Sequence, residues 1–289
     1  MTYDALGVGA LDYLPCRYGT SKLLFRGPRR RLERDYVAFI GGTETYGKFI
    51  EHPFPDLIEQ ATGLTCVNLG YPNAGVDVFA HDPFVPEAVA AARVTVVQVL
   101  GAQNMSNRFY SVHPRRNDRF VKASPLLQTI YGEVEFAEYH FTKHLLTNLV
   151  TLSPERFEMV RQELQQAWIA RMKLLLSQIS GKIILLWFAP RSPEQDEKMQ
   201  EFGADPMFVT RDMIDAVRSA VTDVVEVVAS PEALARGTDG MVFAQMEAPA
   251  ADHIMGPGAH EEAAAVLSDV VAGYTKTKKG PPECGGPSI

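Results

Sequence analysis

The sequence predicts a three-layer α/β/α sandwich around a flavodoxin-like, parallel five-stranded sheet, and two observations predict it. Five short runs of residues are almost entirely apolar, which is typical of strands buried on both faces of a parallel sheet. Segments with helical periodicity separate these runs, as in doubly wound α/β domains. With 289 residues, of which 46% are hydrophobic, the chain can bury a substantial core.

The first part of the domain contains three predicted strands and two predicted helices. The run VAFIG, residues 37–41, is apolar up to a closing glycine and predicts the first strand. FPDLIEQATG (54–63) predicts a helix that stops at its glycine, and LTCVNLG (64–70) predicts the second strand. PEAVAAAR (86–93) is helical, and VTVVQVLG (94–101), rich in β-branched residues, predicts the third strand.

A segment rich in aromatic and basic residues, 103–152, interrupts this alternation and is interpreted as an insertion. The clearest helix of the chain follows it, because Ser153 is placed to cap the helix, apolar residues recur every three or four positions, and Gly181 stops it. The remaining elements are, in order, a strand at 182–188, a helix at 209–221, a strand at 223–229 and a helix at 260–274.

These elements form one predicted domain, 36–274, with a segment on either side. Residues 1–35 lack clear periodicity and are predicted to be an irregular arm, in which RGPRRRLER (26–34) is interpreted as a solvated surface or a subunit contact. The tail 275–289 is rich in Pro and Gly, so it is predicted to be disordered in an isolated monomer.

Composition excludes several functions. The net charge of −7 is spread along the chain, which argues against a nucleic-acid partner. Cys16, Cys66 and Cys284 form no CxxC pair and no cluster with His, so we expect reduced thiols and no metal. Glycine-rich nucleotide motifs are absent at the strand ends, and no cofactor is predicted. With neither a signal-peptide pattern nor a bilayer-length apolar run, a cytoplasmic location without membrane insertion is expected.

Ligands of open α/β sheets bind beyond the carboxyl ends of the strands, so the turns there are the candidate site. Four segments resemble, in order, the blocks of the SGNH, or GDSL-type, hydrolases: GGTETYG (41–47), VNLGYPNAG (67–75), VLGAQNMSNRFY (99–110) and DHIMGPGAHEEAAAVL (252–267). Two longer stretches, DYLPCRYGTSKLLFRGPRRR joined to GGTETYG and GAQNMSNRFYSVHPRRNDRF, resemble more closely the DUF6473 domain proteins, a bacterial group.

The SGNH resemblance implies an SGNH-hydrolase-like fold and an ester hydrolase or acyltransferase. Its substrates would be O-acyl esters, often acetyl groups on sugars, and its site a nucleophile, an imidazole base and an oxyanion hole. It places Thr43 where the family has its nucleophilic serine and Gly42 where an aspartate precedes it. The remaining roles fall on Gly75 or Gly70 and on Asn104 or Gln103 as oxyanion donors, and on His260 or His253, with Asp252, as the base.

Two alternatives accompany this interpretation. Thr43 is also placed to cap a short helix over 44–47, and Asn73 to bond its own turn. The scaffold is then a non-catalytic glycan-binding protein or a structural subunit of a cell-surface or phage-like assembly, as a homo-oligomer or in a larger complex. Arginine binds anionic groups with two hydrogen bonds, so carbohydrate or another acylated small ligand is expected to contact Asn73, Asn107, Arg108, Arg115 and Arg116.

Overall fold

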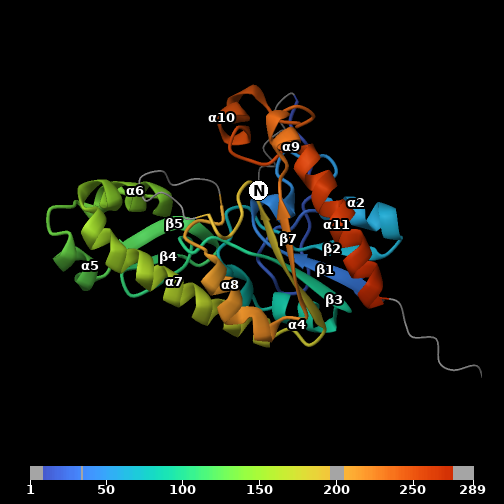
Figure 1. Cartoon of the computed structure of the whole chain (residues 1–289), viewed down its shortest axis with the longest axis horizontal. Helices are drawn as coiled ribbons and strands as arrows, with labels where there is room; N and C mark the ends of the chain where they lie inside the picture. The colour runs from blue at the N-terminus through green and yellow to red at the C-terminus, as the bar shows by residue number, and fades with distance from the viewer. Residues whose placement is uncertain (1–8, 34, 196–204, 276–289) are drawn as a thin grey trace, which may run out of the picture.

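The computed structural model of the protein describes residues 9–33, 35–195 and 205–275. Its centre is a parallel five-stranded sheet in the order β2-β1-β3-β6-β7, with helices on both faces (Figure 1). That order is the one found in flavodoxin-like sheets. The predicted three-layer α/β/α fold is therefore confirmed, and its strands are β1 (Tyr36–Ile40), β2 (Thr65–Asn68), β3 (Val94–Gln98), β6 (Lys182–Ala189) and β7 (Asp223–Val228).

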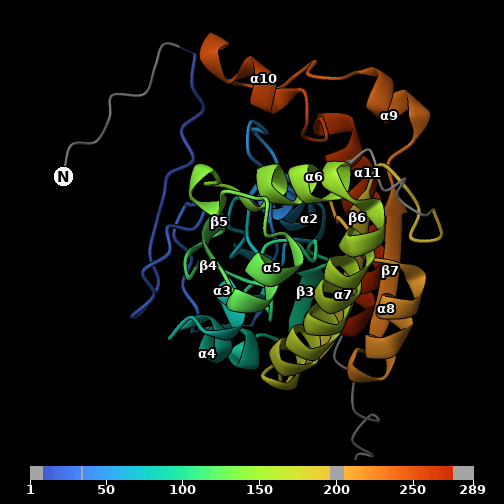
Figure 2. The ribbon, with the colours of Figure 1, turned by 90° about the vertical axis from the view of Figure 1, so that its left-hand side faces the viewer.

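Alternate side chains of the sheet belong to two separate apolar layers. On β1, Val37 and Phe39 pack in the layer that contains the helices α2 (Phe54–Thr62) and α11 (Pro257–Thr275), while Ala38 and Ile40 pack in the opposite one. Both faces exclude water, which is why the strands are apolar at successive positions. Figures 1 and 2 show the opposite layer, which is formed by α3 (Val76–Ala80), α4 (Val85–Ala91), α7 (Pro154–Ser177) and α8 (Arg211–Val217).

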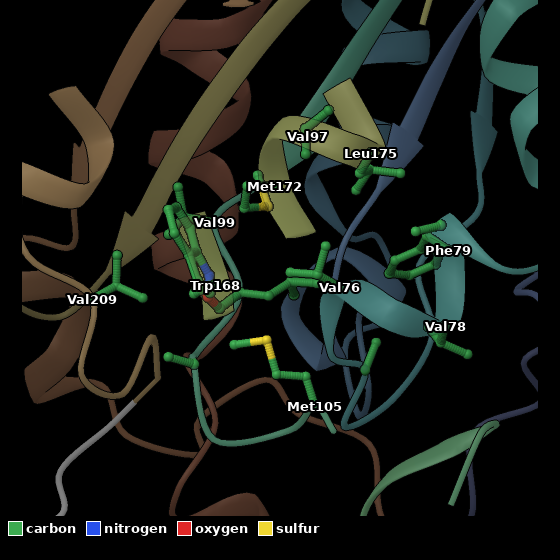
Figure 3. Packing of buried hydrophobic residues seen from close by; sticks show 14 of the residues in the cluster. Val76, Val78, Phe79, Val97, Val99, Met105, Trp168, Met172, Leu175 and Val209 are labelled. Carbon is green, nitrogen blue, oxygen red and sulfur yellow. The ribbon is translucent and has the colours of Figure 1, made fainter. Parts of the chain in front are cut away.

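The long helix α7 organises the second layer. Trp168 and Met172 of α7 lie against Val76 of α3 and Val99, just beyond β3 (Figure 3). Trp168 is fully buried, and its Nε1–H donates to the carbonyl of Leu100 at 2.7 Å. This bond satisfies the only polar group of the indole and fixes the chain as it leaves β3 for the candidate site.

The predicted helix boundaries are largely confirmed. The left-handed Gly63, with φ 69°, ends α2 as expected, because glycine adopts this conformation without steric cost. Ser153 caps α7, since its Oγ accepts the N–H of Arg156 at 3.3 Å. The helix ends at Ser177, short of the predicted glycine stop, and α8 passes into a 3-10 helix, η2 (Arg218–Ala220).

The insertion predicted at 103–152 contains regular structure. A β-hairpin projects from the sheet with three helical segments beside it (Figure 1). Its elements are β4 (Tyr110–His113), β5 (Arg116–Ala123), α5 (Pro125–Ile130), the 3-10 helix η1 (Phe136–Glu138) and α6 (Thr142–Leu152). Four short elements complete the described chain: α1 (Thr43–Tyr46), α9 (Pro231–Ala235), the 3-10 helix η3 (Gln245–Glu247) and α10 (Ala248–Ala251).

The described part of the arm, 9–33, packs against the core. Leu23 and Phe25 are buried, and a short antiparallel bridge joins Cys16 to Phe25. The interpretation of the arginine-rich stretch as surface is wrong for Arg26, which is also buried. The predicted disorder of the tail lies outside the described residues, apart from Thr275 at the end of α11. Within the described ranges, no helix is both long and apolar enough to cross a bilayer.

Candidate functional site

The turn after β1 is held by one side chain of β3. The Oε1 atom of buried Gln98 accepts the N–H of Gly42 at 3.0 Å, the N–H of Thr45 at 3.2 Å and the hydroxyl of Thr45 at 2.6 Å. A Cβ on Gly41 would lie 2.1 Å from the Thr45 hydroxyl oxygen, so this position has no room for a side chain. The sharp exit from β1 is thus set by the strand beside it.

Thr43 begins α1 and does not cap it. The N-cap position is Gly42, which makes no side-chain cap, so the capping interpretation of Thr43 is wrong. The Thr43 Oγ1 atom instead accepts the N–H of Asn73 at 3.0 Å and lies 3.4 Å from Asn73 Oδ1. Asn73 has a left-handed φ of 55°, a conformation that asparagine tolerates. A backbone amide therefore occupies a lone pair of the candidate nucleophile.

The candidate oxyanion donors are engaged in bonds within the protein. Gly75 donates its N–H to Asn117 Oδ1 at 3.0 Å. Asn104 Nδ2 donates to the Asn73 carbonyl at 3.3 Å, and Asn104 Oδ1 accepts the Thr142 hydroxyl at 2.7 Å. The structure thus brings the second and third blocks together with the insertion in one polar network, in which each donor already has an acceptor.

The two alternative donors are also engaged. The N–H of Gly70 is bound by Asn68 Oδ1 at 2.9 Å. Gln103 is buried, and its Nε2 donates to Asp205 Oδ1 at 2.8 Å. Its Oε1 is a buried acceptor with no hydrogen-bond partner among the described residues. Burial raises the pKa of the neighbouring Tyr110 phenol, so this hydroxyl stays a donor, and it bonds the Gln103 carbonyl at 2.6 Å.

His260 lies inside the protein, fully buried at the start of α11. Its ring packs between Phe54 and Phe188, with centroid distances of 5.8 and 5.4 Å. Nδ1 accepts the N–H of Phe54 at 3.2 Å, so a neutral ring carries its proton on Nε2. That Nε2 faces Glu44 Oε2 at 3.7 Å, and each of these two buried atoms lacks a hydrogen bond in the described chain.

Neighbouring residues of the first turn therefore face different partners. The side chain of Thr43 contacts Asn73, whereas that of Glu44 faces His260. Among the described residues, no hydrogen bond joins Thr43 to an imidazole. The alternative pair, Asp252 and His253, is exposed in the turn that follows α10. The catalytic roles of Thr43, Asp252, His253 and His260 stay predictions.

The predicted ligand-binding residues fall into two groups. Asn107 shapes its own loop, because its Oδ1 accepts the N–H groups of Phe109 at 2.8 Å and Tyr110 at 3.1 Å. Arg108 Nε bonds the carboxylate of buried Glu163 at 2.5 Å, so its charge is paired. The other group consists of exposed side chains: Asn73, Arg115 and Arg116.

Several residues of this network carry no local sequence signal. Asn117 looks like an ordinary polar residue in a charged segment, and Gln98 looks like an ordinary polar residue in an apolar strand. Glu44 looks like a surface residue. Their positions depend on contacts across 42 to 211 residues of chain. A hint was available for Gln98 alone, as the only amide in a strand otherwise made of Val and Thr.

In the described chain, no group of three or more His, Cys, Asp or Glu is arranged to hold a metal.

Comparison with known proteins places the chain in a family. The model of the "Domain of unknown function (DUF6473)" matches residues 1–275, whereas no curated protein matches. One solved structure, described as a gut microbial diltiazem-metabolizing enzyme, matches with 11% identity and a TM-score of 0.33. The match covers 87% of this chain and 48% of that protein, so this chain spans about half the length of the solved structure. The SGNH resemblance stays a prediction, while the family is shown: the chain belongs to the DUF6473 family.

Proposed function

We propose that the protein is a non-catalytic glycan-binding protein of SGNH-like architecture, which binds its ligand beyond the carboxyl ends of the strands. One observation carries the proposal: the groups that hydrolysis would need are committed to internal hydrogen bonds. The Gly75 N–H is bound to Asn117, the Asn104 amide to Asn73, and the Thr43 oxygen to the Asn73 N–H.

The energetic argument favours binding over catalysis. An oxyanion hole works because its N–H donors have no acceptor within the protein and bind the negative charge that develops in the transition state. Here a developing oxyanion would first have to displace the Asn117 carboxamide, which would leave a buried polar group unpaired. The imidazole of His260 is likewise fully buried between two phenylalanine rings, away from the exposed surface where a substrate would bind.

The accessible groups of the site suit a sugar. Thr43 is half-buried, and Asn73 presents an exposed carboxamide beside it. Sugar hydroxyls pair with such amides, and aromatic rings stack on sugar faces. Phe141, at the start of the insertion helix α6, keeps 41% of its surface exposed. The site thus offers neutral polar groups, with an exposed aromatic ring next to Thr142, which bonds Asn104.

The test combines an esterase assay with calorimetric binding of oligosaccharides. The wild type and Thr43→Ala are expected to hydrolyse aryl acetates and acetylated glycans at the same background rate, while the wild type binds glycan fragments. Asn73→Gly keeps the left-handed backbone and removes only the carboxamide, so it should weaken glycan binding about tenfold. Thr147→Ala, on the exposed face of α6, is the control.

Hydrolysis by the wild type that Thr43→Ala abolishes would show that the protein is an esterase and that the proposal is wrong. Unchanged glycan binding by Asn73→Gly would instead show that the glycan does not bind at this turn.

A further inference from the structure

The tip of the β4–β5 hairpin carries an unpaired positive charge. Between Tyr110 and Ala123 there are four basic side chains and one carboxylate, a formal charge of +3 in a chain of net charge −7. The basic residues are Arg115, Arg116, Arg119 and Lys122, and the carboxylate is Asp118. The hairpin is thus a local exception to the acidic character of the molecule, and its field favours an anionic ligand.

About half of the arginines in the described chain form an ion pair with a carboxylate. Eight of them form ion pairs: Arg30, Arg93, Arg108, Arg156, Arg161, Arg171, Arg211 and Arg236. The guanidinium groups of Arg115 and Arg116 are exposed and contact no described carboxylate. Arg119 lies over the ring of Phe141 at 4.0 Å, which leaves its edge accessible to a further acceptor.

The backbone beneath these two arginines is ordered by local bonds. The Nδ1 atom of His113 accepts the N–H groups of both Arg115 and Arg116 at 3.2 Å, which closes the two-residue tip. Both guanidinium groups therefore extend from a fixed turn, and less conformational entropy is lost when they bind a ligand.

The tip is also tied to the candidate site. Asn117 Nδ2 donates to the His113 carbonyl at 3.1 Å, while its Oδ1 accepts the N–H of Gly75. One carboxamide thus links the arginine turn to the loop that contains Asn73. Figure 2 shows the hairpin among α3, α5 and α6, and β5 contacts both α3 and α6.

We infer that the glycan bound at this site is anionic and that Arg115 and Arg116 bind its carboxylate, sulfate or phosphate group. The inference rests on the proposed function and names its ligand class. Guanidinium forks match the planar oxygen pairs of such groups, and two adjacent forks on a fixed turn can hold one group or two consecutive charged sugars.

Asp118 offers a variant that should improve binding. It is half-buried beside Arg116 and Arg119, and burial raises the pKa of its carboxyl group. A carboxylate at this position opposes the binding of an anion at the tip. Asp118→Asn removes that charge without changing shape, so it should bind an anionic oligosaccharide about twofold to threefold more tightly.

The experiment is calorimetric titration with a uronic-acid oligosaccharide, a sulfated oligosaccharide and a neutral oligosaccharide of equal length. The charged fragments should bind the wild type more tightly, with affinity that falls as salt rises, and Arg115→Ala/Arg116→Ala should lose about tenfold or more. The matched control, Lys182→Ala/Arg218→Ala, removes two charges at the amino ends of β6 and β7 and should bind like the wild type.

Each contrary outcome identifies what failed. Equal binding of neutral and charged fragments, unchanged in the double variant, would overturn the anionic assignment and leave glycan binding in place. Binding of a single-stranded oligonucleotide as tight as that of the charged glycans would overturn the glycan class. If no oligosaccharide binds, both this inference and the proposed function are wrong.

Discussion

Gly75→Ala is expected to destabilise the protein by more than about 4 kcal/mol, enough to leave much of it unfolded. A Cβ at this position would lie 1.5 Å from the carbonyl oxygen of Asn104 and 2.6 Å from its carbonyl carbon. Neither backbone can move away at low cost, because Gly75 is bonded to Asn117 and Asn104 is bonded to Asn73 and Thr142.

Urea denaturation followed by circular dichroism measures this effect. Gly273→Ala is the matched control, since its Cβ meets no atom within 4 Å and α11 gains a better helix former there. The control should gain up to about 1 kcal/mol. If Gly75→Ala unfolds within about 1 kcal/mol of the wild type, the two loops do not pack as the structure shows.

Arg26→Ala is expected to cost about 3 kcal/mol or more. Its guanidinium bonds four carbonyls, those of Tyr46, Gly47, Ile50 and Glu51, at 2.7 to 3.3 Å. Burial lowers the pKa of Arg26, and none of these acceptors is a carboxylate, so the cation replaces its hydration with carbonyl dipoles. Without it, the loop after α1 loses one hydrogen bond to each of the four carbonyls, and in the described chain only the Gly47 carbonyl keeps another loop donor, the N–H of Ile50.

Two further variants make this test specific. Arg26→Lys keeps the charge, but its point-like ammonium cannot span four acceptors, so most of the loss should remain. Arg29→Ala, which removes an exposed arginine three residues away, should change stability by less than about 0.5 kcal/mol. Thermal and urea denaturation compare all three proteins. Full stability of Arg26→Lys would show that charge alone, without the four bonds, holds the loop.

The sheet was predictable because its signal is local. Apart from Thr95, Gln98 and Lys182, the residues of VTVVQ and KIILLW are apolar on both faces of the strand, which is the pattern expected of a strand buried in a parallel sheet. The hairpin in the insertion was not predictable by the same rule. β5 reads RNDRFVKA, and its strand conformation depends on pairing with β4 and on contacts with α6.

The candidate site was predictable only in outline. Strand order gathers the turns at one edge of the sheet, and the bonds among Thr43, Asn73 and Asn104 confirm that these three turns meet. The direction in which each side chain points could not be predicted from the sequence, because adjacent residues in a turn can point to opposite sides. For this reason the sequence did not show that His260 faces Glu44, or that Arg26 is buried while its described neighbours Arg29 and Arg31 are exposed.

The bonds of Asn117 also bear on how this chain could change during evolution. A single codon change would convert Thr43 to serine, yet the Gly75 N–H would stay bound to Asn117. Replacing Asn117 to free that donor would also remove the hydrogen bond that anchors the arginine turn through His113. A variant of this chain that gained esterase activity in this way would therefore lose the hydrogen bond between Asn117 and His113, which helps to fix the hairpin, before a serine at position 43 could act as a nucleophile with a free oxyanion donor.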